Sequence, residues 1–160
     1  MPWSYTTVHG SIPWVRYRNH TLHDQAVMHS DVRAAMGMVS ELVSGRDLHE
    51  FCGALKGCDI ILPVRRRGSR NVFPVVLADD LSDLTGIELS PVVECTSGIF
   101  LTTGNGRECR RYCIGDVVVG ARYALVDDRL KTGGTVETFR RHLETNGAYL
   151  SVCALATRSR

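Results

Sequence analysis

Four short apolar segments constrain the fold of this chain most strongly. They read CDIILPV (58–64), PVVEC (91–95), ARYALV (121–126) and AYLSVCALA (148–156). Short apolar runs rich in β-branched residues are typical of strands that are buried on both faces. Segments with helical periodicity lie between them. This alternation predicts an α/β fold, a parallel sheet with helices on both faces, in which ligands bind at the carboxyl ends of the strands.

The helical segments can be delimited by their apolar spacing and by their end signals. Residues 30–55 predict two helices that divide near Gly45, with Ser30 as the first N-cap. Residues 72–86 predict a third helix, and residues 134–147 a fourth that stops at its terminal Asn-Gly pair. The first thirty residues show no clear periodicity. We therefore expect an N-terminal extension over 1–30 and one α/β domain over 31–160.

Composition predicts an ordinary soluble protein. Hydrophobic residues make up 44% and charged residues 22% of the 160 residues, and the net charge of +2 is too small to indicate nucleic acid or an anionic membrane by itself. No apolar stretch approaches the roughly 18 to 20 residues that cross a bilayer. The N-terminus lacks the apolar segment of a secretory signal, and the six cysteines show no C-x-x-C spacing. We expect reduced thiols and a cytoplasmic location.

The loop after the third apolar segment carries the most informative motif. It reads LVDDRLKTGGT, from Leu125 to Thr135. The two glycines allow a ligand close to the backbone, and the following helix offers free N–H groups to a phosphate. Asp127 and Asp128 would repel a phosphate but accept hydrogen bonds from a vicinal diol. A phosphorylated ribose satisfies both halves. Neither a Walker-type motif nor a Gly-x-Gly-x-x-Gly string is present.

This string closely resembles the phosphoribosyl-pyrophosphate (PRPP) binding motif of type I phosphoribosyltransferases. The resemblance implies that Asp127 and Asp128 contact the ribose hydroxyls and act in catalysis. It implies that the 5′-phosphate is held by Lys131, Thr132, Gly133, Gly134 and Thr135. One position departs from the family, because the residue after the second acid is usually apolar and here is Arg129. A charge there faces solvent or contacts a ligand or partner.

A second anion site is expected after the first core strand. In the family this loop binds the pyrophosphate, and here it would use Arg65, Arg66, Arg67 and Gly68. Guanidinium groups suit pyrophosphate because each is a planar, permanently charged fork. A solvated basic loop is the alternative. The string RRRGSRN also resembles the competence-associated branch of the superfamily, although the cysteine-rich zinc module of that branch is missing.

The segment around Gly104-Asn105-Gly106 predicts a hairpin between the second and third core strands. In the family a flexible loop at this place closes over the substrate. Its basic residues here are Arg107, Arg110 and Arg111. Closure would bring positive charge near the pyrophosphate. A surface hairpin with solvated arginines is the alternative.

The function implied by the resemblance is Mg²⁺-dependent transfer of a phosphoribosyl group from PRPP to a nitrogenous base or amine. Arginines would neutralise the leaving pyrophosphate, and Asp127 and Asp128 would favour positive charge at the anomeric carbon and meet Mg²⁺ indirectly through the ribose. Two alternatives stay open. One is a non-catalytic regulator that binds PRPP or a nucleoside monophosphate, and the other is a DNA-associated accessory protein that uses the arginines as a basic face.

The acceptor cannot be named from the sequence. The first thirty residues are the candidate for a hood over the acceptor ring, with four aromatic residues available for stacking: Trp3, Tyr5, Trp14 and Tyr17. The same aromatics could instead form a homodimer contact or pack on the core.

Overall fold

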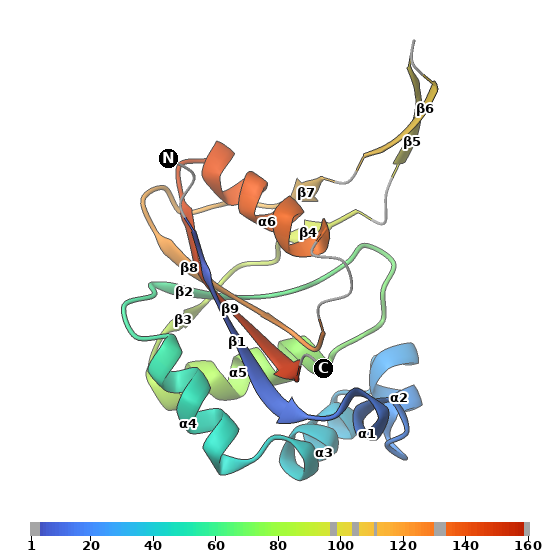
Figure 1. The fold of residues 1–160 in the computed structure, drawn as a ribbon, viewed down its shortest axis with the longest axis vertical. Coiled ribbons are helices and arrows are strands. Elements are labelled where there is room, and N and C mark those ends of the chain that lie inside the picture. The colour runs from blue at the N-terminus through green and yellow to red at the C-terminus, as the bar shows by residue number, and fades with distance from the viewer. Residues whose placement is uncertain (1–3, 97–98, 104–105, 111, 130–133, 159–160) are drawn as a thin grey trace.

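A computed structural model describes residues 4–96, 99–103, 106–110, 112–129 and 134–158. Its centre is a five-stranded sheet in the order β1-β9-β8-β2-β3, in which all neighbours are parallel (Figure 1). These strands are β1 (Thr6–Ile12), β2 (Ile60–Pro63), β3 (Glu88–Leu89), β8 (Arg122–Asp127) and β9 (Tyr149–Thr157). The predicted α/β fold with a parallel sheet is confirmed.

Helices cover both faces of the sheet, as predicted. They are α1 (Trp14–Arg18), α2 (His23–Met28), α3 (Val32–Leu42), α4 (Gly45–Ala54), α5 (Phe73–Thr85) and α6 (Gly134–Thr145). Figure 1 shows α6 on one side of the sheet and α3, α4 and α5 on the other. Successive side chains of β8 point to opposite faces of the sheet. Val126 therefore packs in the cluster of α3–α5, whereas Leu125 packs with α6.

Side-chain oxygens cap the first turns of α3 and α4, and one of the two caps differs from the predicted residue. The carboxylate of Asp31 accepts the N–H of Ala34 and so caps α3. The predicted cap Ser30 is wrong: its φ is 54°, and its hydroxyl donates to the carbonyl of Arg70 instead. The hydroxyl of Ser44 caps α4, which begins at Gly45, where the division between two helices was predicted.

The segment 91–95, which was predicted to be a strand of the central sheet, does not join that sheet. The edge position beside β2 is taken by β3, and only β4 (Glu94–Cys95) is extended within the predicted segment. It pairs antiparallel with β7 (Cys113–Ile114), outside the central sheet. Pro91 explains the break, because proline has no N–H to continue a ladder beyond Ser90, which still donates to the carbonyl of Ile61.

The first thirty residues contribute to the same core as the rest of the chain. β1 lies at the edge of the sheet beside β9, and α1 and α2 follow it. Tyr17 and Ala26 are fully buried in the cluster that contains α3–α5. The sequence pattern predicted neither the strand nor the two short helices. The use of this segment as a hood stays a prediction.

The predicted hairpin is present as β5 (Ile99–Thr103) paired antiparallel with β6 (Gly106–Arg110). Figure 1 shows that it extends away from the sheet, beyond β4 and β7. Among the residues that the structure describes, no helix is long and apolar enough to span a membrane.

Candidate functional site at the carboxyl end of β8

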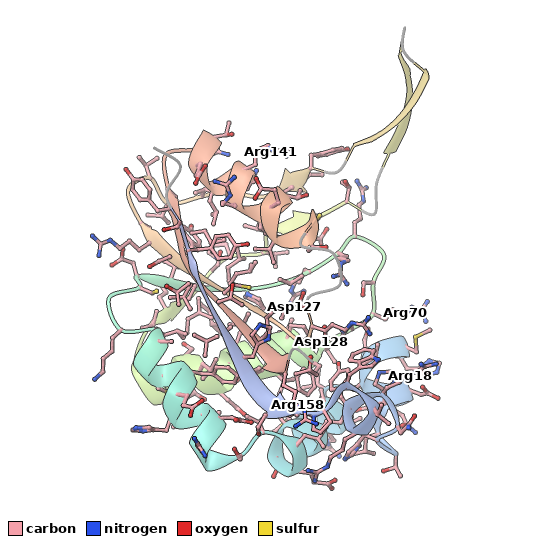
Figure 2. All side chains as sticks on the ribbon, viewed as in Figure 1. Arg18, Arg70, Asp127, Asp128, Arg141 and Arg158 are labelled. Atoms are coloured by element: carbon pink, nitrogen blue, oxygen red, sulfur yellow. The ribbon has the colours of Figure 1, made fainter. Side chains whose placement is uncertain are left out.

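The acidic pair lies where the sequence placed it. Asp127 is the last residue of β8, flanked by β2 and β9, and Asp128 follows directly. Both are buried, with 2% and 8% of their surface exposed. In Figure 2 the two acids lie at the end of the sheet that faces the N-terminal helices, with Arg18, Arg70 and Arg158 labelled on the segments around them. Two buried carboxylates side by side are costly unless each has partners.

Asp127 is partnered by a backbone group and by an arginine. Its Oδ1 accepts the N–H of Asp128 at 2.8 Å, and its Oδ2 lies 3.7 Å from Nη2 of Arg66. Burial, followed by the neighbouring Asp128 carboxylate, raises the pKa of Asp127 well above its ordinary value, and Arg66 offsets only part of this rise. Asp127 therefore holds a proton more readily than an exposed aspartate does.

Asp128 is held by three separate parts of the chain. Its Oδ2 accepts the hydroxyl of Tyr17 at 2.6 Å and the side-chain amide of Asn71 at 2.8 Å. Its carbonyl oxygen accepts both the N–H and the hydroxyl of Thr157, at 3.0 and 2.8 Å. Burial and the adjacent Asp128 raise the pKa of Tyr17 far above its ordinary value, so the phenol stays a donor.

Neither contact with Asp128 was predicted, because Tyr17 was named only as an aromatic of a possible hood and Asn71 was given no role. Asn71 ends the RRRGSRN string, which was noted for its arginines. The string did not indicate that its asparagine contacts the acid. Tyr17 lies 111 positions from Asp128 along the chain, and nothing in its neighbours indicates that contact.

Arg129 contacts an aromatic ring of the same chain. Its guanidinium carbon lies 3.9 Å from the centre of the Trp14 ring, which is a cation–π contact. The structure shows an internal contact of this charge with α1, and a contact of Arg129 with a ligand or partner stays a prediction. Trp14 also stacks on Tyr17, with ring centres 5.3 Å apart.

The N-terminal aromatics are largely occupied by protein contacts. Tyr17 is fully buried, and Trp14 stacks on Arg129 and Tyr17. Tyr5 packs against the cluster beneath α6, and Trp3 lies outside the described residues. Among these aromatics, the described ones are therefore used mainly within the fold.

The arginine loop meets the acids through Arg66. Nη2 of Arg66 lies 3.4 Å from the hydroxyl oxygen of Thr135 in addition to its contact with Asp127. Backbone bonds fix the loop, because the carbonyl of Arg65 accepts the N–H of Cys95 and the N–H of Arg67 donates to the carbonyl of Cys95. The side chain of Arg67 is exposed, and Gly68 turns the chain with a φ of 80°.

The phosphate loop is only partly described. Gly134 and Thr135 form the first turn of α6, as predicted. Lys131, Thr132 and Gly133 lie outside the described residues, as do Arg111 and the side chains of Arg107 and Arg110. The structure thus brings together Asp127, Asp128, Arg66 and Thr135, from the loop after β2 and the connection between β8 and α6, at the carboxyl end of the sheet.

Asp127 and Asp128 could hold a metal together with a bound ligand. Within the described ranges, no group of three or more His, Cys, Asp or Glu side chains is arranged around a common point. The carboxylates of Asp127 and Asp128 are hard oxygen donors, which suits Mg²⁺. This ion is commonly bound by one or two carboxylates plus phosphate oxygens of a substrate.

Comparison with known proteins gives partial similarities. The chain matches no family model. It is 29% identical over 142 residues to Protein TraN of Escherichia coli, which covers 83% of this chain and 31% of that protein. The chain thus spans about a third of the length of this curated relative.

Two similar solved structures are phosphoribosyltransferases. Adenine phosphoribosyltransferase from Thermoanaerobacter pseudethanolicus ATCC 33223 has a TM-score of 0.48 and 19% identity, covering 78% of this chain and 73% of that chain. Purine phosphoribosyltransferase from Pyrococcus horikoshii Ot3 has a TM-score of 0.48 and 22% identity, covering 68% and 70%.

Proposed function

We propose that this protein binds PRPP and transfers its phosphoribosyl group to a nitrogenous base or amine, with release of pyrophosphate. One observation carries the proposal: Arg66 lies beside both Asp127, at the end of β8, and Thr135, at the start of α6. Groups that can bind an anion and groups that can bind a diol thereby lie together at one site. A sugar phosphate carries both functions in a single molecule.

The two halves of the site suit the two ends of the sugar. The first turn of α6 presents backbone N–H groups and the hydroxyl of Thr135 to the 5′-phosphate. The carboxylates of Asp127 and Asp128 accept hydrogen bonds from the ribose hydroxyls. The string LVDDRLKTGGT, which resembles the PRPP-binding motif, spans both halves.

Arg66 supplies the charge for the leaving group in this proposal. It lies on the loop after β2, where the resemblance places the pyrophosphate, and its guanidinium already lies beside the carboxyl group of Asp127. Binding of pyrophosphate would give this guanidinium a more highly charged partner with several acceptor oxygens.

The reaction exchanges one bond at the anomeric carbon. The lone pair of the acceptor nitrogen forms the new C1–N bond, while the C1–O bond breaks and its electron pair leaves with pyrophosphate. The proton of the acceptor nitrogen passes to pyrophosphate or to solvent. Positive charge develops on the sugar as the bond breaks, and the carboxylates of Asp127 and Asp128 stabilise that charge.

Mg²⁺ is the cofactor expected for this chemistry. When bound, it neutralises pyrophosphate oxygens, and Asp127 and Asp128 would hold it indirectly through the ribose. The protein side chains then position the sugar.

Cys52, Cys58 and Cys153 are free thiols, which supports a reducing compartment such as the cytoplasm as the place of action.

The test is release of pyrophosphate from PRPP in the presence of Mg²⁺ and a panel of bases and amines. We expect turnover with at least one acceptor and a loss of about 100-fold or more in the Asp127→Asn variant, because a charge at the reacting centre is removed. Turnover that is equal in this variant would contradict the assigned role of Asp127.

A regulator that binds PRPP or a nucleoside monophosphate without turnover is the second candidate. It is favoured by one observation: Trp14 and Tyr17, which could have stacked on an acceptor ring, are engaged with Arg129 and Asp128. Thermal stabilisation by PRPP that is abolished in Thr135→Ala, together with no release of pyrophosphate from PRPP with any acceptor, would establish it.

A further inference from the structure

We propose that Tyr17 and Asn71 are positioning residues that orient the carboxylate of Asp128 toward the ribose diol, so that α1 sets the selectivity for the sugar hydroxyls. The inference rests on the proposed function. It adds residues of the N-terminal segment and of the arginine loop to the sugar site.

The two donors converge on one atom. The hydroxyl of Tyr17 and the amide of Asn71 reach Oδ2 of Asp128 at 2.6 and 2.8 Å, and Asp128 is only 8% exposed. Two donors on one oxygen fix the rotation of the carboxylate and commit that oxygen to the protein. The proposal assigns the other oxygen, Oδ1, to a sugar hydroxyl.

Tyr17 is itself immobilised by packing. Its side chain is fully buried, with the rings of Phe73 and His23 packed edge-on at 5.0 and 5.3 Å and the ring of Trp14 stacked at 5.3 Å. A phenol held on several sides can direct its O–H only along a narrow range of directions. The placement of α1 therefore determines where the hydroxyl of Tyr17 meets Asp128.

The orientation of the Asn71 amide is equally determined. Its oxygen accepts the N–H of Phe73, the first residue of α5, at 3.0 Å. The amide nitrogen must then face Asp128, because the oxygen is engaged at the helix start. Asn71 thus has two functions, to satisfy a free N–H of α5 and to donate to the acid.

A further contact ties α1 to the residue after the acid. Arg129 lies over the ring of Trp14, so the chain just before residues 130–133 is anchored on the same short helix that holds Asp128. The residue that departs from the family pattern is thereby part of the same arrangement as Tyr17.

The test compares ribose 5-phosphate with its 2-deoxy and 3-deoxy analogues by titration calorimetry, with inorganic phosphate as a diol-free probe. We expect the wild-type protein to bind ribose 5-phosphate about tenfold more tightly than at least one deoxy analogue, since a hydrogen bond to a charged group is lost. In Tyr17→Phe this ratio should fall to within about twofold, while phosphate affinity stays unchanged.

Two further variants distinguish a positioning role of Tyr17 and Asn71 from a general effect on the stability of the protein. Tyr123→Phe is the matched control, because Tyr123 is also fully buried and its hydroxyl accepts the N–H of Val118 at 2.9 Å, toward the other end of β8. It should leave the selectivity unchanged. Asn71→Asp keeps an oxygen for the N–H of Phe73 but faces Asp128 with an acceptor, so it should lower the selectivity as Tyr17→Phe does.

The outcomes are distinguishable. Unchanged selectivity in Tyr17→Phe, or an equal loss of affinity for all four probes in it, would overturn the positioning role while leaving the proposed function intact. Absence of binding of every sugar phosphate by the wild-type protein would refute the proposed function and the inference with it.

Discussion

Nη2 of Arg66 lies 3.7 Å from Oδ2 of Asp127, so an arginine from the loop after β2 partly neutralises the buried acid that ends β8. The same guanidinium reaches the first turn of α6 at Thr135. A guanidinium between a buried carboxyl group and the first turn of a helix is well placed to contact an anionic ligand there.

Replacement of Arg66 should weaken pyrophosphate binding selectively. We expect Arg66→Ala to lower the affinity for Mg²⁺-pyrophosphate by about tenfold or more, since one charged hydrogen-bond donor is removed. Arg46→Ala is the control, because its exposed guanidinium pairs with Glu50 on α4 and is no part of the expected anion site. Titration calorimetry measures both, and equal losses in the two variants would contradict a specific role for Arg66.

The buried acid should give stability a defined dependence on pH. The folded protein raises the pKa of Asp127 well above 3.8, so it binds the proton more tightly than the unfolded chain does. The contribution is therefore present below about pH 4 and is lost as the pH rises toward the raised pKa, with a limiting slope of about 1.4 kcal/mol per pH unit.

Asp127→Asn isolates this effect. The amide has nearly the same shape and does not titrate, so urea unfolding from pH 4 to pH 8 should show a flatter decline of the free energy of unfolding than in the wild-type protein. Parallel curves for the two proteins would show that Asp127 does not have the raised pKa.

Arg129 and Trp14 should be energetically coupled. A double-mutant cycle with Arg129→Leu and Trp14→Leu, measured by chemical unfolding, should give a coupling of about 1 kcal/mol, as expected for a partly buried cation–π pair. Strictly additive losses would indicate that the stack adds nothing to the stability of the loop that follows Asp128.

The packing of β1 on β9 should not tolerate a side chain at Gly10. A Cβ there would overlap the carbonyl oxygen of Ala156, which lies on β9 just before the residue that binds Asp128. We expect Gly10→Ala to lower the free energy of unfolding by about 2 kcal/mol or more. Gly45→Ala is the matched control, because a Cβ at that position meets no atom within 4 Å.

Much of the sheet could be predicted because its strands obey a simple rule. The segments that became β2, β8 and β9 are short and apolar, which is typical of a strand buried on both faces. The prediction failed at 91–95, where the same composition occurs but Pro91 ends pairing with the central sheet. Apolar composition reports burial and does not report which sheet a segment joins.

The places of Asp127, Asp128 and Thr135 in the fold could be predicted because the motif that holds them is continuous in sequence. Tyr17 could not, because its contact with Asp128 depends on how α1 packs against Phe73 and on the return of β1 to the sheet. The internal contact of Arg129 has the same origin, since its partner Trp14 lies on α1. Long-range contacts of this kind leave no local pattern to read.

The most direct test of the central claim is titration calorimetry of the protein with PRPP in the presence of Mg²⁺. Thr135→Ala is the variant, and Thr145→Ala, at the exposed far end of α6, is its control. We expect saturable binding by the wild-type and Thr145→Ala proteins and a loss of affinity of about tenfold or more in Thr135→Ala. No saturable binding, or equal affinity in all three proteins, would contradict the claim.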